Sequence, residues 1–454
     1  MHPSFEYALV CCVAAAGSFV LTPLARAVAI AWRAVAMPRD RDVHAVATPR
    51  LGGLAMLGGL VAAFGVAHML PTLQTTFTNP GADIGWIVIS GVFICLLGVL
   101  DDRYDLDSVT KLAGQVLVTG LMVTKGGVQL SAIYVPWGHA GTVVLGQDIA
   151  IPVTILMVVL TINAINFIDG LDGLAAGVSA IGAGAFFLYA YHLAVIGHTD
   201  IAAAPTLLAA CLVGACLGFL PHNFSPARIF MGDSGSMLIG LFLSAAATTA
   251  TTSGDPQTLF GNLLGSLPLA LPLLVPLAVL AIPFMDLVLA VLRRLRRRQS
   301  PFAADKEHLH HRMLEIGHTH RRAVLLLYFW SALLSFGAVA FSITRSAWAV
   351  VSVVLVLAVL GVLLSAIPRL RSSRSEEETR IGWPTDPPVA DEEAPHSVSS
   401  TSLLTGPPGE SGEPAEALLA GTEVTAAGEA QAAPPVVGAP VSSPIGSVDV
   451  AHTR

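Results

Sequence analysis

The stretch Asn163–Leu174 reads NAINFIDGLDGL, and it decides how the rest of the chain is arranged. One long apolar run leads into it and a second leads out, so two asparagines and two aspartates lie where the chain leaves and rejoins a membrane. Ionisable groups are costly in hydrocarbon, and carboxylates at such a place generally face a polar pocket. A solvated acidic loop is the simpler alternative, but loops rarely interleave Asn, Asp and Gly so densely between spans. We interpret the stretch as a functional site.

The composition is that of a polytopic membrane protein. Of 454 residues, 54% are hydrophobic and only 12% are charged. Repeated apolar runs of about 20 residues exclude an ordinary soluble globule. All five cysteines fall inside these runs without a Cys-x-x-Cys spacing, so we expect buried small side chains rather than a metal site.

The apolar runs predict an all-α fold with about eleven transmembrane helices. The expected spans are Tyr7–Ala29, Leu51–Leu70, Ile84–Leu100, Leu112–Thr124, Ile149–Ile162, Leu174–Ile196, Ala203–Leu220, Ser236–Thr252, Leu263–Leu292, Ala323–Ile343 and Ala347–Ile367.

The positive charges predict the orientation of these spans. If the loop Trp32–Arg50 faces the cytoplasm, alternation places nearly every lysine and arginine on that side, and only Lys125 and Arg345 fall outside. The N-terminus is then outside and the C-terminus is cytoplasmic. The same alternation brings every acidic cluster to the cytoplasmic face, so the two signals agree.

The chain divides into a membrane domain, residues 1–371, and a tail, residues 375–454. The tail is rich in Pro, Ala, Gly and Ser and carries 13 acidic residues against two arginines. It cannot bury enough apolar surface to offset its ordering entropy, so we expect a disordered cytoplasmic segment. The remainder has a net charge of +4, which is a topology signal and not a nucleic-acid footprint.

Four further cytoplasmic segments carry chemistry. They are TPRLGG at Thr48–Gly53, DDRYDLD at Asp101–Asp107, HNFSPARIFMGDSGS at His222–Ser236 and DKEHLHHR at Asp305–Arg312.

The adjacent carboxylates Asp101 and Asp102 predict a cation site. Neighbouring carboxylates repel one another unless a cation relieves them, and Mg²⁺ binds through one or two carboxylates plus substrate phosphates. An acidic helix end paired with Arg103 and Lys111 is the alternative. This ion-paired helix end is the weaker interpretation, because further aspartates are expected on the same face of the membrane.

The other two motifs also suit a phosphate site. In MGDSG, Asp233 lies between glycines and small hydroxyls, which favours a metal or close approach of a phosphate, although the sequence is also that of an ordinary turn. The histidines His308, His310 and His311 indicate either a zinc site or hydrogen bonding to phosphate beside Arg312. We favour phosphate, because it fits an oxygen-rich Mg²⁺ site. Taken together, the segments predict phosphoryl transfer, with a lipid as one reactant.

These motifs (NAINFIDGLDGLA, DDR, PRLGG, NFSPARIFMGDSGS and HLHHR) resemble, in order, those of the polyprenyl-phosphate N-acetylhexosamine-1-phosphate transferase family. The motif resemblance runs from about Pro49 to Arg312, and DKEHLHHR resembles the branch that uses UDP-N-acetylglucosamine. The family's reaction implies that a polyprenyl phosphate attacks the sugar-bearing phosphate of UDP-N-acetylglucosamine. UMP leaves, and a lipid-diphospho-sugar remains.

The resemblance also implies roles for individual residues. Asp101 and Asp102 match the aspartate pair thought to activate the lipid phosphate and assist the metal, and Asp233 matches the principal Mg²⁺ ligand. The remaining matches are expected at the nucleotide, sugar and diphosphate: Asn166, Asp169, Asp172, Asn223, Phe230 (stacked on uracil), His308, His310, His311 and Arg312. Asp169 and Asp172 are also expected to be catalytic. Arg50 and Arg103 are expected at the lipid headgroup.

The resemblance implies Mg²⁺, or Mn²⁺ in its place, as cofactor. The expected partners are UDP-N-acetylglucosamine, undecaprenyl or decaprenyl phosphate and the lipid bilayer, with a homodimer allowed and nucleic acid excluded. The expected location is a bacterial plasma membrane, with the active site on the cytoplasmic face. A secondary transporter with a carboxylate-lined cytoplasmic site is the main alternative. It would favour internal repeats and binding groups near the bilayer midplane, and the sequence has neither feature. A membrane anchor that displays the acidic tail would leave the motifs unexplained.

Overall fold

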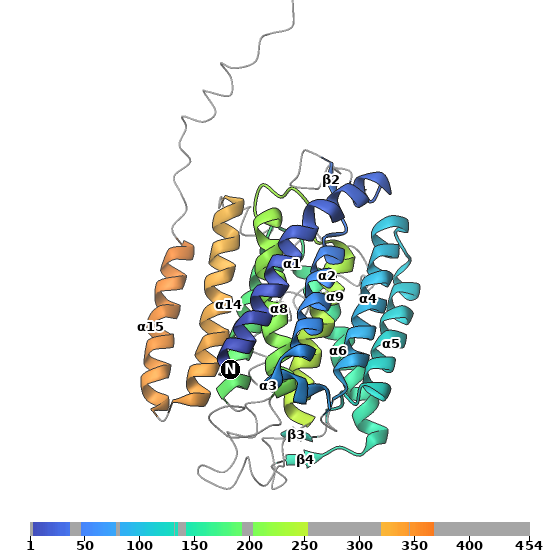
Figure 1. The fold of residues 1–454 in the computed structure, drawn as a ribbon. Helices are drawn as coiled ribbons and strands as arrows, with labels where there is room; N and C mark the ends of the chain where they lie inside the picture. Colours follow the sequence, from blue (N-terminus) through green and yellow to red (C-terminus); the bar gives the residue numbers. More distant parts are fainter. Residues whose placement is uncertain are drawn as a thin grey trace, which may run out of the picture. The chain divides into compact units, whose positions relative to one another are not determined.

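The computed structural model describes residues 3–36, 47–78, 82–130, 132–134, 142–192, 203–252, 319–344 and 346–366, all within the unit Met1–Ile381. The helices are α1 (Pro3–Ala31), α2 (Gly52–Met69), α3 (Pro71–Gln74), α4 (Ile84–Tyr104), α5 (Ser108–Lys125), α6 (Gln147–Ile168), α7 (Leu174–Tyr191), α8 (Ala203–Asn223), α9 (Gly232–Thr252), α14 (His320–Ile343) and α15 (Ala347–Ala366) (Figure 1). Two short antiparallel ribbons pair β1 (Val35–Ala36) with β2 (Thr48–Pro49) and β3 (Ala132–Tyr134) with β4 (Thr142–Val144).

The helical membrane fold is confirmed in outline. Ten of the eleven predicted spans coincide with described helices, and the eleventh, Leu263–Leu292, lies outside the described residues, as does the tail. Seven of the described helices are long and apolar enough to cross a membrane: α1, α2, α4, α6, α7, α8 and α14. The total of eleven spans and the sides of the two termini stay predictions.

Two helix boundaries differ from the sequence prediction in a way that shapes the site. α6 continues six residues past the expected end, to Ile168, so Asn163 and Asn166 lie on its last turns rather than in a loop. The connection to α7 is therefore short, and it closes at Gly173, whose φ of 76° suits a residue without Cβ. α9 begins at Gly232, which places Asp233 in its first turn.

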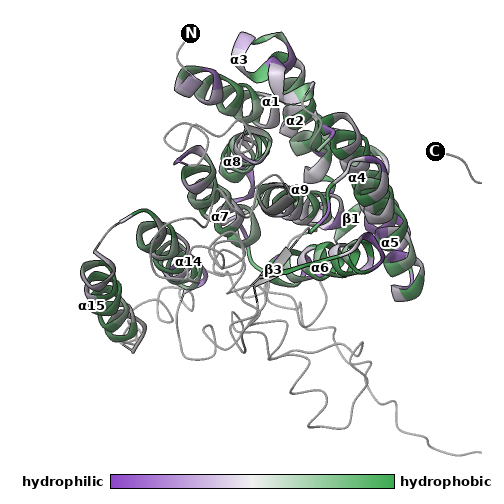
Figure 2. Cartoon of the chain, turned by 90° about the horizontal axis from the view of Figure 1, so that it is seen from below, coloured by the Kyte–Doolittle hydropathy of each residue, from purple (hydrophilic) through white to green (hydrophobic). Residues whose placement is uncertain are grey.

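Helix α9 is the centre of the bundle. It packs against α2, α4, α6, α7 and α8, and Figure 2 shows it surrounded by them. Its residues from Ser234 to Ala250 are all buried, and many of them are Ala, Ser, Thr or Gly. Small residues let membrane helices approach closely. At Gly98 of α4, a Cβ would lie 2.4 Å from the Cα and N atoms of Ser234.

This close approach predicts a large effect for Gly98→Ala. The added methyl must push α4 away from the first turn of α9, which costs about 1–3 kcal/mol by the usual size of an overpacked contact. It also moves Asp101 and Asp102 relative to Asp233, so catalytic turnover should fall together with the unfolding temperature. Gly65→Ala in α2 is the matched control, because a Cβ there meets nothing within 4 Å. Equal behaviour of the two variants in thermal unfolding would contradict the tight α4–α9 contact.

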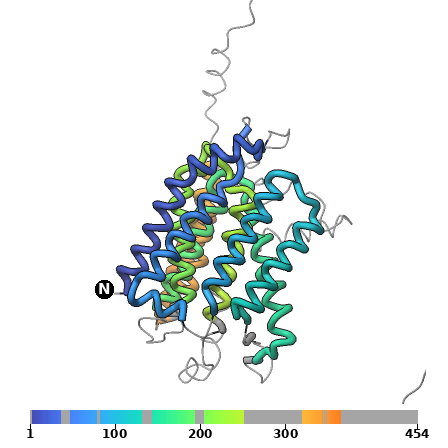
Figure 3. The backbone as a smooth tube through the Cα atoms, turned by 45° about the vertical axis from the view of Figure 1, so that its right-hand side comes forward, coloured from blue at the N-terminus to red at the C-terminus, as the bar shows by residue number. Residues whose placement is uncertain are grey.

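Helices α4 and α5 form an antiparallel pair joined by the short turn Asp105–Asp107 (Figure 3). Asp105 has a left-handed backbone, with φ of 48°, and ends α4. Asp107 begins α5, because its carboxylate accepts hydrogen bonds from the N–H groups of Val109 and Thr110 at 3.1 and 3.0 Å. The turn carries the first residues of α5 back towards the carboxylates of α4.

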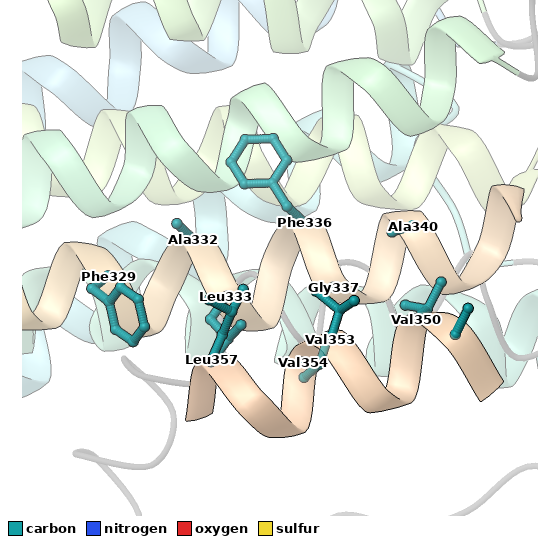
Figure 4. Close-up of a pocket in the computed structure, with 11 residues that line it drawn as sticks. Phe329, Ala332, Leu333, Phe336, Gly337, Ala340, Val350, Val353, Val354 and Leu357 are labelled. Carbon is teal, nitrogen blue, oxygen red and sulfur yellow. The ribbon is translucent and has the colours of Figure 1, made fainter. Parts of the chain in front are cut away.

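Helices α14 and α15 line an open apolar pocket of about 510 Å³ (Figure 4). Its lining consists of aliphatic and aromatic side chains with Gly337, and no charged or hydrogen-bonding side chain lines it. Such a pocket cannot bind phosphates or a metal ion, so the functional site must lie elsewhere.

Candidate functional site

The carboxylate of Asp102 caps helix α9 from a different helix. It is 7% exposed, and its two oxygens accept hydrogen bonds from the N–H groups of Asp233 and Ser234, at 2.9 and 3.1 Å. These N–H groups have no partner inside α9, and a negative charge there complements the helix dipole. Gly232 allows the approach, because a Cβ at this residue would lie 2.4 Å from Asp102 Oδ2. The carboxylate thereby fixes the position of Asp233.

The ammonium group of Lys111 joins the other two carboxylates. Its Nζ atom lies 2.6 Å from Oδ2 of Asp101 and 2.6 Å from Oδ1 of Asp233. Asp101 also accepts a hydrogen bond from the N–H of Leu106 at 2.9 Å, which holds the turn after α4. Asp101 and Asp102 are adjacent in sequence but bind different partners. Lys111 therefore sets the distance between α4 and the start of α9.

A chain of polar side chains extends the network along α5, α6 and α9. Asn166 donates to both Asp233 Oδ1 and Ser236 Oγ. One turn earlier, Asn163 donates to Gln115 Oε1 at 2.7 Å, and Gln115 in turn donates to the sulfur of Met237 at 3.7 Å. Buried polar groups of this kind need partners, and these side chains supply them to one another.

The Asp169 carboxyl lies directly after α6, beside this network. Burial raises its pKa to about 8, and the nearby negative charges of Asp233 and Asp102 act in the same direction. The Arg50 guanidinium opposes them by favouring the ionised form. Asp169 therefore titrates near neutral pH, where a proton can be taken up or released during a reaction.

A strand-like backbone link joins the start of α2 to the segment before α9. The N–H of Phe230 donates to Pro49 at 2.8 Å, and the N–H groups of Gly52 and Gly53 donate to Phe230 and Met231 at 3.1 Å each. Leu51 turns the chain between them with φ of 82°. We call this link the 50–230 latch. It places Arg50 and Phe230 at the same end of the bundle as the carboxylates.

Asp172 and Asn223 hold the loops on the other side of α9. The Asp172 carboxylate is 4% exposed and accepts a hydrogen bond from the N–H of Ala227 at 3.1 Å. Asn223 is 2% exposed; its oxygen accepts from the N–H of Gly173 and its amide donates to the carbonyl of Ile229, both at 3.1 Å. Both side chains are thus engaged with backbone.

The geometry predicts that Asn223→Ala acts on stability first. The substitution leaves a buried N–H of Gly173 and a buried carbonyl of Ile229 without partners, which costs about 1–3 kcal/mol per group. We expect a lower unfolding temperature and a KM for the nucleotide sugar that changes little at temperatures where the chain is folded. Arg103→Ala, at an exposed position, is the stability control. A large rise in KM with unchanged unfolding would instead support the predicted ligand role of Asn223.

The structure thus brings together six of the ten predicted site residues that it describes. Hydrogen bonds or ion pairs link Asp101, Asp102, Asp233 and Asn166, and Asp169 and Arg50 adjoin them. Phe230 is half-buried at the 50–230 latch, whereas the exposed Arg103 lies over the ring of Tyr104 at 5.3 Å. The ligand roles of all these residues stay predictions. His308, His310, His311 and Arg312 lie outside the described residues.

The sequence analysis missed three members of the network. Lys111 was considered only as an ordinary ion-pair partner, and Gln115 and Ser236 were not singled out. The spacing of two of these residues along the predicted helix could have revealed them. Lys111 and Gln115 are four residues apart, so they share one face of α5, and a lysine and a glutamine on one face at a membrane span need polar partners.

The carboxylates offer a fitting set of donors for a magnesium ion. Oxygens of Asp101 and Asp233 converge from two helices on one cationic group, which Lys111 supplies. Hard oxygen donors of this kind, completed by substrate phosphates, suit Mg²⁺. Within the part of the chain that the structure describes, no group of three or more His, Cys, Asp or Glu side chains is placed to hold a metal by itself. A metal ion bound here would need phosphate oxygens to complete its ligand set.

Comparison with known proteins identifies the family. The model of glycosyl transferase family 4 matches residues 84–251. A decaprenyl-phosphate N-acetylglucosaminephosphotransferase of Mycolicibacterium smegmatis is 45% identical over 373 residues, which cover 81% of this chain and 90% of the relative. The protein of that name from Mycobacterium tuberculosis is 44% identical, over 74% of this chain and 82% of the relative. An undecaprenyl-phosphate alpha-N-acetylglucosaminyl 1-phosphate transferase of Salmonella typhimurium is 30% identical, over 69% and 77%. The chain belongs to the polyprenyl-phosphate N-acetylhexosamine-1-phosphate transferase family.

Proposed function

We propose that this chain transfers N-acetylglucosamine 1-phosphate from UDP-N-acetylglucosamine to a membrane polyprenyl phosphate. An oxygen of the lipid phosphate forms a bond to the sugar-bearing phosphorus. The bond from that phosphorus to the oxygen bridging the two phosphates breaks, and UMP leaves with this oxygen. The products are polyprenyl-diphospho-N-acetylglucosamine and UMP. The relatives, named for polyprenyl-phosphate acceptors and N-acetylglucosamine, support this assignment.

The observation that carries the proposal is the shared position of the carboxylates. Asp101 and Asp102 of α4 meet Asp233 where α9 begins, and Lys111 of α5 joins them, so three helices build one charged site. Phosphoryl transfer needs mainly positioning and charge stabilisation, and a rigid cluster of this kind provides both.

We propose that the site lies on the cytoplasmic side of a bacterial plasma membrane. The described arginines Arg26, Arg33, Arg50, Arg103, Arg228, Arg321 and Arg322 all lie on or beside the helix ends that carry the site. Lysine and arginine accumulate on the cytoplasmic side of membrane proteins. UDP-sugars are made in the cytoplasm, so this orientation gives the donor direct access.

We propose that Mg²⁺ binds at Asp233 together with Asp101 or Asp102. When bound, it neutralises charge on the diphosphate. Lys111 keeps the carboxylates in place and adds a positive charge beside them. Asp102 aligns α9 by accepting hydrogen bonds from its first N–H groups. Arg50 adds a second fixed positive charge next to Asp169.

Asp169 is suited to take the last proton of the lipid phosphate. A phosphate monoester loses its second proton near a pH of ~6 by analogy with phosphorylated side chains. The oxygens of Asp101 and Asp102 already accept protein hydrogen bonds. Asp169 lies directly after α6, and burial raises its pKa to about 8. We assign to Asp169 the acceptance of this proton as the attack begins.

The assignment predicts the pH dependence of turnover. Because the pKa of Asp169 is raised to about 8, turnover should increase as pH rises towards that value. Asp169→Asn should lower turnover and remove the inflection near pH 8, and the measurement is a pH–rate profile at saturating substrates. An inflection that persists in the variant would remove Asp169 from this role.

The raised pKa of Asp169 also makes the stability of the fold depend on pH. Since the folded-state pKa lies above the ordinary value of 3.8, the folded chain binds the Asp169 proton more tightly than the unfolded chain does. Ionisation of Asp169 therefore destabilises the fold progressively as pH rises from about 4 to about 8. In the Asp169→Asn variant, the free energy of unfolding should therefore fall less between these pH values than it does in the parent.

A direct assay tests the function. Purified chain in lipid nanodiscs would receive decaprenyl phosphate, Mg²⁺ and UDP-N-acetylglucosamine labelled in the sugar, with UDP-glucose and UDP-N-acetylgalactosamine in parallel. We expect label to enter the lipid fraction in equal amount to UMP released, with N-acetylglucosamine as the best donor. Label that stays in water, or UMP released without a lipid product, would overturn the proposal.

A further inference from the structure

A second pocket lies at the same end of the bundle and is separate from the carboxylate network. It has a volume of about 660 Å³, and it is formed by the end of α1, by β2 and by the segment between α8 and α9. Its polar lining includes Arg26, Arg228, His222 and Thr48, and no carboxylate lines it. Pockets of this size hold small ligands. None of the residues assigned above to phosphoryl transfer lines it.

The arginines of this pocket carry its positive charge. Among the described residues, Arg26 donates a hydrogen bond from Nε to the carbonyl of Arg228 at 3.1 Å. Both arginines are exposed, and neither forms an ion pair with a carboxylate in the described part of the chain. The buried carboxylate of Asp172 contacts the pocket lining, because its Oδ2 atom accepts a hydrogen bond from the N–H of Ala227. Two guanidinium groups on one pocket favour an anion.

His222 adds a third polar group inside the pocket. Its Nε2 atom is buried and has no hydrogen-bond partner among the described residues. Its ring also lies 4.7 Å from that of Phe19 on α1. A buried ring nitrogen without a partner is costly unless a ligand or water satisfies it. His222 thus stands between the arginines and an apolar surface.

The apolar surface is a strip of α1. Cys12, Ala16 and Phe19 share one face of this helix, at spacings of four and three residues, and all three are exposed although α1 is apolar enough to cross a membrane. Arg26 follows Phe19 by seven residues, which is roughly 10 Å along a helix axis. A bilayer would place this strip in its acyl region and the two arginines at its headgroups. The pocket and the strip therefore match the two ends of one amphiphilic molecule.

We propose that this pocket binds the phosphate of an anionic phospholipid, such as phosphatidylglycerol, with one acyl chain along Phe19, Ala16 and Cys12. The headgroup phosphate accepts hydrogen bonds from Arg26 and Arg228, and the His222 ring lies beside it. Binding at this site ties the end of α1 to the α8–α9 segment, and it is independent of the transfer reaction proposed above. Free phosphate shares the headgroup chemistry but would make no use of the strip.

The test measures lipid retention. The full chain is reconstituted in phosphatidylcholine nanodiscs doped with phosphatidylglycerol, released into mild detergent and examined by native mass spectrometry. The double variant Arg26→Gln/Arg228→Gln should retain phosphatidylglycerol about tenfold less than the parent, as expected for the loss of charge-assisted hydrogen bonds. Arg33→Gln is the matched control, because it makes the same change two turns further along, at an exposed residue outside the pocket.

Two further arms separate the sources of the phosphate and guard against misfolding. Arg26→Lys/Arg228→Lys keeps the charge and should recover most of the retention. Ala16→Gln should weaken phosphatidylglycerol retention without changing the binding of inorganic phosphate. Retention by the double glutamine variant at the parent level would overturn the proposal. Displacement of the lipid by inorganic phosphate, with no effect of Ala16→Gln, would also overturn it, since the ligand would then be a soluble anion.

Discussion

Replacing Asp233 with asparagine is expected to lower turnover by roughly a thousandfold while the fold survives, a loss of the size seen when one main electrostatic group is removed from a site. The asparagine oxygen can still accept hydrogen bonds from Lys111 and Asn166, so the network keeps its shape. Only the negative charge that would hold the metal is lost. UMP release measured over a series of Mg²⁺ concentrations, beside thermal unfolding, separates these effects.

The matched control is Asp107→Asn. Asp107 undergoes the same chemical change on a neighbouring segment, but it is an exposed N-cap of α5, and asparagine caps helices about as well as aspartate. Its turnover and Mg²⁺ dependence should match those of the parent. If Asp233→Asn kept its Mg²⁺ dependence and most of its turnover, the metal would have to be assigned to other residues.

The second large effect concerns Lys111. Lys111→Met should lower turnover by about a hundredfold or more, because Asp101 and Asp233 lose the ammonium group that holds both at 2.6 Å. The concentration of Mg²⁺ needed for half-maximal activity should fall at the same time. A positive charge next to a cation site opposes the cation by several kcal/mol at an effective dielectric of about 20, and the variant removes it.

Damage to the fold would lower turnover without lowering the Mg²⁺ concentration needed for half-maximal activity. A change in both quantities therefore indicates that Lys111 acts at the metal site. Lys125→Met, at the exposed last residue of the same helix, removes the same charge far from the network and should change neither quantity. A Lys111→Met enzyme that needs more Mg²⁺ than the parent would mean that the lysine organises the metal site and does not compete with it.

The sequence predicted the helices well, because apolar length alone specifies a membrane span. It placed the ends of α6 and α9 less well. Asn163 and Asn166 read as loop residues because isolated asparagines favour turns, yet in α6 their amides bind Gln115, Asp233 and Ser236. These partners come from α5 and α9, and their tertiary contacts override local preference.

The candidate site was predictable as a set of residues and not as a geometry. The motifs named Asp101, Asp102 and Asp233, but the sequence predicted that the adjacent pair would act together. In the structure, Asp101 turns to Lys111 while Asp102 caps α9. That division depends on how closely Gly98 and Gly232 let the helices approach, which residue spacing within one segment does not reveal.

The 50–230 latch has a consequence for how the protein is made. Its two halves are separated by about 180 residues of chain, which a ribosome synthesises in roughly ten to forty seconds. During that time α1 and α2 can already occupy the membrane, while the N–H groups of Gly52 and Gly53 have only water to bind at its edge. Arg50 can be held near Asp169 by the latch only after Phe230 and Met231 have been synthesised. Completion of the charged site is therefore a late event in synthesis, and a nascent chain stopped before α9 carries the first motif without the ability to use it.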